Sequence, residues 1–301
     1  MNTLSIWIAA TRPKTLGASL CPVLVGAALA LHDGVFAFTP VMLALLGACL
    51  LQIASNFAND LFDGLRGADS GARIGPTRAV GSGLVTPKAM RVAVCIALAL
   101  AAVPATFLAQ RAGSAFAFIG VIGALCAVAY TAPPIALAYR GLGEVFVFAF
   151  FGPLAVAGTR AACDGQWTVP ALVCGIGPGA IAVCLLATNN LRDHVNDAVV
   201  GKRTLAVRFG PRAARVEITA CHAAAFALPI VAGMAFHLPL GILLASVVAA
   251  VFARASFSLW FERPTNSLNA NLSMFGALLY LYGVAFAAGV WLGVVVKGPS
   301  L

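Results

Sequence analysis

Two short clusters of asparagine and aspartate stand where long apolar stretches of this sequence end. The first cluster contains Asn56, Asn59, Asp60 and Asp63, and the second contains Asn189, Asp193 and Asp197. Successive residues of a helix are about 100° apart, so each cluster falls within one face of a helix. Ionised side chains are costly in an apolar segment and usually serve a function there. The two clusters therefore form the first candidate site.

The chemistry that these side chains suggest is the binding of a hard divalent cation. Carboxylate and amide oxygens are the ligands that Mg²⁺ prefers, and Mg²⁺ commonly takes one or two carboxylates together with substrate phosphates. We expect Asp63, Asp193 and Asp197, helped by Asn59 and Asn189, to hold metal ions that bridge a diphosphate. Such ions would stabilise the diphosphate as it leaves its substrate. Asp69 follows two glycines, so it is either metal-linked or an ordinary loop residue.

Basic residues accompany both clusters and can neutralise the remaining phosphate charge. Those nearest are Lys14, Arg78, Lys202 and Arg203. His194 is turned about 100° away from Asp193 on a helix, so we leave it out of the site. The four tyrosines, Tyr130, Tyr139, Tyr280 and Tyr282, are interpreted as interfacial or packing aromatics.

Several enzyme classes are excluded, because the sequence contains no GxSxG, Walker, HExxH or Rossmann glycine pattern. An ion-coupled transporter remains the alternative from another class, since its intramembrane Asp and Asn residues would bind cations. Transporter sites lie near the middle of the bilayer, whereas these clusters lie at the ends of apolar stretches beside basic loops. This position favours an enzyme.

The elements that must carry the clusters are membrane-spanning helices. The chain of 301 residues is 61% hydrophobic and 10% charged, which excludes an ordinary soluble domain. Apolar stretches of about 20 residues each predict helices that cross a bilayer. We predict a single all-α, polytopic membrane domain over residues 1–301 with about nine spans: 15–32, 39–62, 88–110, 114–131, 144–160, 168–193, 213–236, 238–258 and 270–296.

The distribution of basic residues predicts the orientation in the membrane. With nine spans and the N-terminus inside, all of the 19 lysines and arginines lie on the inner side except Arg111, Arg160 and Lys297. This asymmetry places the N-terminus and both clusters in the cytoplasm. The net charge of +9 therefore reflects topology in a lipid bilayer, not affinity for nucleic acid.

The spacing of the clusters suggests an internal repeat. Asn56-x3-Asp60 and Asn189-x3-Asp193 are separated by about half of the chain. Duplicated halves near 1–140 and 141–301 would place a site at their interface, although the matching stretches are too short to decide it. The two longest polar connections, 64–87 and 192–215, each follow one cluster.

Taken together, these motifs resemble the UbiA superfamily of intramembrane prenyltransferases. Asn59-Asp60-x-x-Asp63 with Gly67-x-Asp69 and Asp193-x3-Asp197 look like its two Asp-rich motifs. The branch of 1,4-dihydroxy-2-naphthoate polyprenyltransferases, which act in menaquinone synthesis, is similar in four further stretches. These are Arg12-Pro13-Lys14-Thr15-Leu16, Arg73-Ile74-Gly75-Pro76-Thr77-Arg78, Gly141-Leu142-Gly143-Glu144, and Asn189-Asn190-Leu191-Arg192-Asp193 with Gly201-Lys202-Arg203-Thr204-Leu205.

The resemblance implies nine transmembrane helices around a central cavity, in a bacterial cytoplasmic (inner) membrane. It implies Mg²⁺ at Asn59, Asp63, Asp193 and Asp197, with Asp60 and Asp69 in support. Asp60, Asp63, Asp193 and Asp197 would be catalytic, and Lys14, Arg78, Asn56, Asn189, Lys202 and Arg203 would bind substrate. The reaction would transfer a polyprenyl group from its diphosphate to dihydroxynaphthoate with loss of CO₂, giving demethylmenaquinone.

Two departures from the branch leave the acceptor open. The connection Thr131-Ala132-Pro133-Pro134-Ile135-Ala136-Leu137-Ala138 is more apolar than the branch leads us to expect, and Glu144 stands where Asp is common. A UbiA-type enzyme acting on another aromatic acceptor, such as 4-hydroxybenzoate or a chlorin, is the alternative within the class.

Overall fold

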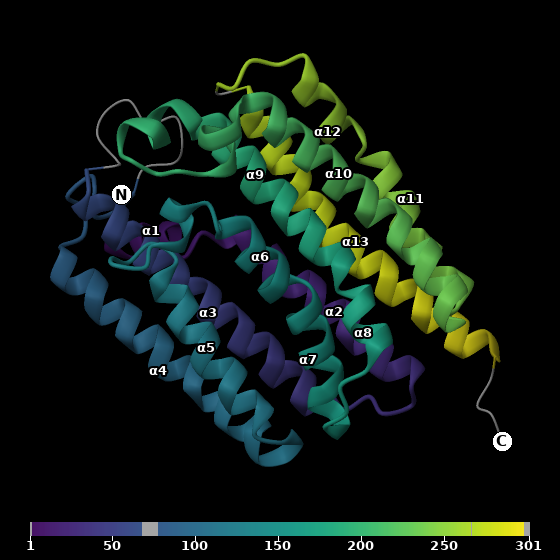
Figure 1. Cartoon of the computed structure of the whole chain (residues 1–301). Coiled ribbons are helices and arrows are strands. Elements are labelled where there is room, and N and C mark those ends of the chain that lie inside the picture. Colours follow the sequence, from purple (N-terminus) through teal and green to yellow (C-terminus); the bar gives the residue numbers. More distant parts are fainter. Residues whose placement is uncertain (1, 68–77, 266, 298–301) are drawn as a thin grey trace.

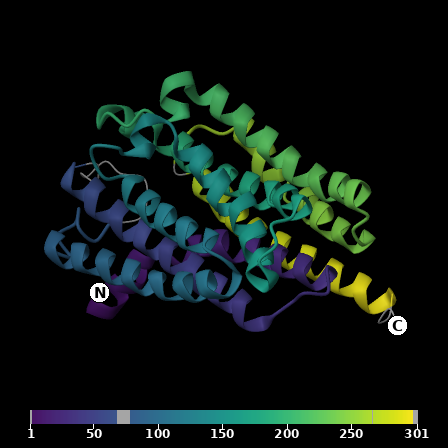
Figure 2. The same ribbon diagram turned by 60° about the horizontal axis from the view of Figure 1, so that its bottom comes forward.

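The computed structural model describes residues 2–67, 78–265 and 267–297. Within these residues every regular element is a helix, which confirms the all-α prediction. Seven helices there are long and apolar enough to cross a membrane, and Gly17–His32 and Ala115–Ala129 are shorter apolar helices. Each of these nine overlaps one of the nine predicted segments. They lie side by side, and the start of α1 (Thr3–Thr11) and the end of α13 (Leu268–Lys297) are at opposite ends of the bundle (Figures 1 and 2).

The first half of the chain forms five helices: α1 (Thr3–Thr11), α2 (Gly17–His32), α3 (Phe38–Leu65), α4 (Pro87–Ala112) and α5 (Ala115–Ala129). The start of α4 is set by local sequence. Thr86 is its N-cap and accepts a hydrogen bond from the Ala89 amide at 3.2 Å, while Pro87 occupies the first helical position. α3 packs along α4, and α2 packs along α13 from the other end of the sequence.

Three of the predicted spans are each broken into two helices, and the breaks in two of them lie together. Segment 144–160 becomes α6 (Gly143–Phe151) and α7 (Pro153–Asp164), and segment 168–193 becomes α8 (Val169–Cys174) and α9 (Ile176–Val199). The breaks meet: a Cβ atom on Gly152 would lie 2.6 Å from the carbonyl oxygen of Gly175. Only a glycine allows this approach of the two backbones.

The second half completes the bundle with one long helix and a broken one. α10 (Leu205–Phe236) begins eight residues earlier than predicted and bends at Gly210, whose φ is 81°. A 3₁₀ turn at Leu240–Ile242 precedes α11 (Leu243–Val251) and α12 (Arg254–Phe257), and a further turn spans Ser258–Trp260. The last helix is α13 (Leu268–Lys297).

An apolar cavity of about 400 Å³ lies among α2–α7. Ser55 and Tyr130 line it toward the ends of α3 and α5, and Leu108 and Phe116 line it at the opposite end, near the end of α4 and the start of α5. The cavity is partly open, and Val121 of α5, another lining residue, is 60% exposed. We call the end of the bundle that carries the Asn/Asp clusters and the 130–142 connection the site end.

Candidate active site

The end of α3 turns its four polar residues toward different partners. Asn56 is buried, and its amide nitrogen donates to the Thr11 carbonyl at 2.9 Å and to the Thr15 hydroxyl at 3.2 Å. Thr15 belongs to a 3₁₀ turn, Pro13–Thr15, that leads into α2. Asn56 therefore fastens the N-terminal segment to α3.

Asp60 holds the return of the chain toward α4. Its two carboxylate oxygens accept from the backbone amides of Ala79 at 2.9 Å and Val80 at 2.8 Å. The side chain is only 3% exposed. Both carboxylate oxygens of Asp60 are thus hydrogen-bonded to backbone amides. The residue anchors the 79–80 backbone beside the other residues of the first cluster.

The side chains of Asn59 and Asp63 both point toward the connection between α5 and α6. Arg78 donates to the Asn59 carbonyl at 2.8 Å and forms an ion pair with Asp63. Asn59 Oδ1 accepts from the Thr131 hydroxyl at 3.0 Å, and Asp63 Oδ1 accepts from the Tyr139 hydroxyl at 2.8 Å. Both donors lie in the connection between α5 and α6, within or just before the 3₁₀ turn Leu137–Arg140.

The Tyr139 hydroxyl is a dependable donor at neutral pH. Burial, together with the negative charge of Asp63, raises the pKa of Tyr139 above its usual range. The guanidinium of Arg66 lies 4.0 Å from the centre of the tyrosine ring, a cation–π contact that covers its face. The ring is therefore held from one side by an arginine and at its hydroxyl by a carboxylate.

The second cluster, on α9, is organised by an arginine within it. Arg192 grips both oxygens of Asp193, with two nitrogen–oxygen distances of 2.7 Å. The same guanidinium donates to Asn189 Oδ1 and to the Oδ1 of Asn269, a residue of α13, each at 2.8 Å. Arg192 is 3% exposed and Asp193 is 9% exposed, so this is a buried ion pair.

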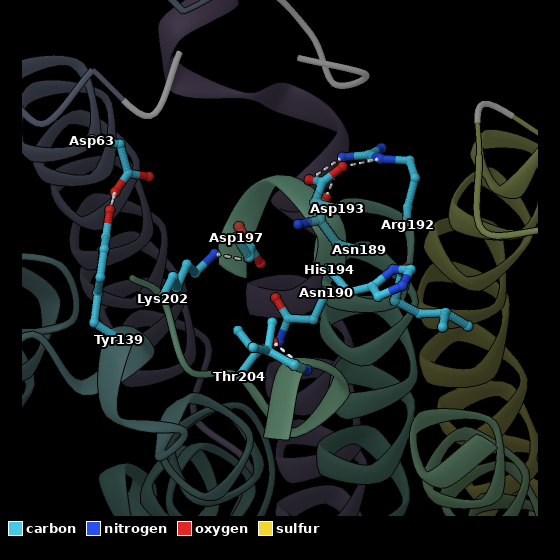
Figure 3. A network of polar contacts seen from close by, with 12 residues as sticks. Asp63, Tyr139, Asn189, Asn190, Arg192, Asp193, His194, Asp197, Lys202 and Thr204 are labelled. Atoms are coloured by element: carbon cyan, nitrogen blue, oxygen red, sulfur yellow. Dashed lines mark hydrogen bonds and ion pairs between the residues drawn. The ribbon is translucent and has the colours of Figure 1, made fainter. Parts of the chain in front are cut away.

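Asp197 faces the first cluster across Lys202 (Figure 3). Lys202 Nζ is 3.4 Å from Asp197 Oδ2, and its charge also acts on Asp63. The Asp63 and Asp197 carboxylates interact electrostatically with each other as well. The two clusters, 134 residues apart at these positions, are therefore brought to one place.

The remaining predicted residues are placed as follows. Asp69 and the side chain of Lys14 lie outside the described residues. The Arg203 side chain is exposed, and the backbone amide of Arg203 donates to the Tyr139 carbonyl at 3.1 Å. His194 hydrogen-bonds to the Leu191 carbonyl of its own helix at 2.8 Å, away from the carboxylates.

Four residues of this constellation were not among the sequence-based candidates: Thr131, Tyr139, Arg192 and Asn269. Arg192 could have been suspected from its position between Asn189 and Asp193. Thr131 and Tyr139 approach the first cluster only through a fold contact that spans more than 70 residues. No spacing rule connects them to Asn59 or Asp63.

The donor set suits a hard cation, and one observation tests the fit. Asp197 Oδ2 is buried and makes no hydrogen bond, and its charge is offset by the ammonium of Lys202 at 3.4 Å. Within the described residues, however, no three His, Cys, Asp or Glu side chains are already gathered as a metal-binding group. Basic side chains, those of Arg78, Arg192 and Lys202, stand against the carboxylates instead.

Comparison with known proteins gives a consistent result. The model of the UbiA prenyltransferase family matches residues 19–279. The 1,4-dihydroxy-2-naphthoate octaprenyltransferase of Mycobacterium tuberculosis is 39% identical over 72% of this chain and 74% of its own length. The enzyme of the same name from Haemophilus influenzae is 30% identical over 96% of this chain and 97% of its own.

Solved structures share the fold. A UbiA homologue from Aeropyrum pernix superposes with a TM-score of 0.71 over 91% of this chain and 97% of its own, at 18% sequence identity. A UbiA homologue from Archaeoglobus fulgidus bound to GPP and Mg²⁺ superposes with a TM-score of 0.61 over 95% of this chain and 99% of its own, also at 18% identity.

Proposed function

This chain belongs to the UbiA prenyltransferase family, and from that premise we propose that it transfers a polyprenyl group to 1,4-dihydroxy-2-naphthoate. The net reaction joins the allylic carbon of the prenyl diphosphate to the ring, and releases diphosphate and the ring carboxylate as CO₂. The product is the demethylmenaquinone hydroquinone. The observation that carries the proposal is the convergence of Asp63 and Asp197 across Lys202, beside an apolar cavity.

We propose Asn59, Asp63, Asp193 and Asp197 as the residues that would hold Mg²⁺, with Asp60 and Asp69 in support. When bound, the metal would supply Lewis-acid stabilisation of the leaving diphosphate. The buried Asp197 Oδ2 supports this assignment, because it makes no hydrogen bond and faces the Lys202 ammonium, a cation whose place a metal ion could take. For the metal to bind, Lys202 would have to exchange the Asp197 carboxylate for a phosphate oxygen, and Arg78 would have to exchange the Asp63 carboxylate for an anionic oxygen of a substrate.

Basic side chains of the protein would bind the substrates, and the apolar walls of the cavity would hold the prenyl tail. Lys202 and Arg203 follow the second cluster and would bind the diphosphate, and Lys14 or Arg78 would be available to the acceptor carboxylate. The prenyl tail would lie in the cavity among α2–α7. Its walls exclude water, which would otherwise hydrolyse the allylic cation that forms as diphosphate leaves.

We also propose that the protein lies in the bacterial cytoplasmic membrane with the site end facing the cytoplasm. The support is the asymmetry of basic residues across the nine segments. Aqueous dihydroxynaphthoate and the diphosphate group would then reach the clusters from the cytoplasm, while the tail enters from the bilayer.

Product mass spectrometry tests the function most directly. The purified protein would be incubated with dihydroxynaphthoate or 4-hydroxybenzoate, a panel of prenyl diphosphates, and either Mg²⁺ or EDTA. We expect a prenylated, decarboxylated naphthalenediol that forms with Mg²⁺ and not with EDTA. Product from 4-hydroxybenzoate alone would refute the acceptor and leave the prenyltransferase assignment standing, and turnover in EDTA would refute the metal.

A further inference from the structure

The connection between α5 and α6, residues 130–142, reaches both proposed metal ligands of the first cluster. The Thr131 hydroxyl donates to Asn59 Oδ1 at 3.0 Å, and the Tyr139 hydroxyl donates to Asp63 Oδ1 at 2.8 Å. Thr131 is 2% exposed, so its hydroxyl has little access to water as an alternative partner. Each contact is made to the oxygen-bearing end of a side chain that would bind metal.

The same connection is hydrogen-bonded to the loop that follows the second cluster and to the first turn of α10. The Tyr139 carbonyl accepts from the Arg203 amide at 3.1 Å, and the Arg140 carbonyl accepts from Arg208 Nη2 at 2.7 Å. Gly141 has a φ of 70°, and a Cβ atom there would lie 2.7 Å from the Arg203 carbonyl. The connection also closes on itself, because the Ala138 amide donates to the Tyr130 carbonyl at 2.9 Å.

These contacts make the connection a brace between the two clusters. On one side it holds the oxygens of Asn59 and Asp63, and on the other it holds the backbone beside Lys202. Arg66 fixes the tyrosine ring from a further direction. A carboxylate or amide oxygen has two lone pairs, so it can accept a hydrogen bond from a hydroxyl group and still bind a metal.

We propose that Thr131 and Tyr139 are positioning residues that orient Asn59 and Asp63 for metal binding. The inference rests on the proposed function, because it takes these two residues as metal ligands. Hydrogen bonds from outside the ligand set fix the orientation of a metal ligand, and their loss commonly lowers metal affinity or activity roughly 10- to 100-fold. Neither Thr131 nor Tyr139 needs to touch substrate for this role.

Hydroxyl deletions test the proposal. Thr131→Val and Tyr139→Phe each remove one donor and keep the shape of the side chain. We expect each to raise the Mg²⁺ concentration for half-maximal activity by roughly 10-fold or more, with the KM for dihydroxynaphthoate at saturating Mg²⁺ unchanged. Thr131→Ser keeps the hydroxyl, so its Mg²⁺ requirement should equal that of the wild type. Thr219→Val, the same change on the exposed face of α10, is the matched control.

A binding measurement separates positioning from general damage. Mn²⁺ binding would be followed by electron paramagnetic resonance in the presence of geranyl S-thiolodiphosphate, which ionises poorly. We expect weaker Mn²⁺ binding in Thr131→Val and Tyr139→Phe and no change in Thr219→Val. Wild-type Mn²⁺ affinity in both hydroxyl deletions, even with reduced turnover, would overturn the proposal.

Asp63→Asn, measured in parallel, distinguishes this inference from the proposed function. If Asp63→Asn loses Mg²⁺-dependent turnover while Thr131→Val and Tyr139→Phe keep wild-type metal dependence, only the positioning role fails. If Asp63→Asn itself keeps wild-type turnover and metal dependence, the metal site fails and the positioning role falls with it.

Discussion

At the scale of single residues, the pairing of Arg192 with Asp193 governs how the second cluster is held. Neighbours on a helix point about 100° apart, and the long arginine side chain bends back to reach both oxygens of its neighbour. Its remaining donors go to Asn189 and Asn269, so α9 and α13 meet at one guanidinium. A carboxylate so engaged is oriented before any ligand arrives.

Removal of Arg192 should therefore destabilise the fold as well as the site. Arg192→Met leaves a buried carboxylate without its cation, a change that costs about 3–5 kcal/mol in comparable pairs. We expect a clear fall in melting temperature in detergent, which Arg192→Lys does not fully repair because lysine lacks the planar fork. Arg91→Met, on the exposed face of α4, is the control and should melt like the wild type.

The double variant Arg192→Met/Asp193→Leu distinguishes stability from function. It removes both charges, so its melting temperature should recover relative to Arg192→Met. It should stay inactive, because Asp193 is a proposed metal ligand. Recovery of activity together with stability would contradict that assignment.

Asp63 and Asp197 allow a cleaner separation of charge from packing. Asp63→Asn and Asp197→Asn keep the shape of the side chain and remove the charge that a divalent cation needs. We expect turnover to be lost at saturating Mg²⁺ while the melting curve stays cooperative. The assay is product formation by mass spectrometry, and wild-type turnover in either variant would speak against the shared metal site.

At the scale of helices, the paired breaks at Gly152 and Gly175 explain what sequence reasoning missed. Apolar composition located both segments, since length and hydropathy suffice to recognise a span. It could not reveal the breaks, because a glycine inside an apolar run is also common in continuous membrane helices. The contact between Gly152 and Gly175 exists only once the two segments pack together.

The same limit applies to the first cluster. Helical spacing correctly grouped Asn56, Asn59, Asp60 and Asp63 near the end of α3. It did not show that Asn56 and Asp60 turn toward the N-terminal segment and the 79–80 backbone, while Asn59 and Asp63 turn toward the 130–142 connection. Partners of this kind depend on tertiary contacts, not on periodicity.

Bulk added to the cavity should change the preference for tail length. Gly47 of α3 lines the cavity, and a Cβ atom there meets Pro104 of α4 at an ordinary contact distance of 3.5 Å. Gly47→Leu should therefore fold and occupy tail space. We expect kcat/KM to fall more for octaprenyl diphosphate than for geranyl diphosphate. Ala220→Leu, exposed on α10, should leave that ratio unchanged, and equal losses for both substrates in Gly47→Leu would place the tail elsewhere.

At the scale of the whole molecule, we expect the nine apolar segments of the described residues, an odd number, to put α1 and the end of α13 on opposite sides of the membrane. Single cysteines at Ser82 and Gln166, both exposed and at opposite ends of the bundle, can test the orientation once the eight native cysteines are replaced. An impermeant thiol reagent added to intact cells should label position 166 and spare position 82. In inside-out vesicles the pattern should reverse, and labelling of position 82 in intact cells would invert the proposed orientation.

The proposed entry of the tail from the bilayer, into a partly open cavity whose lining includes the exposed Val121, has a consequence for how the reaction rate depends on the amount of lipid substrate. A tail that enters from the bilayer is counted per unit of membrane area, because it never has to cross water. Saturation should then follow the mole fraction of prenyl diphosphate in the lipid, and added lipid should slow the reaction by surface dilution even when the bulk concentration of substrate is constant. For the acidic acceptor, which arrives from water, the bulk concentration remains the relevant variable.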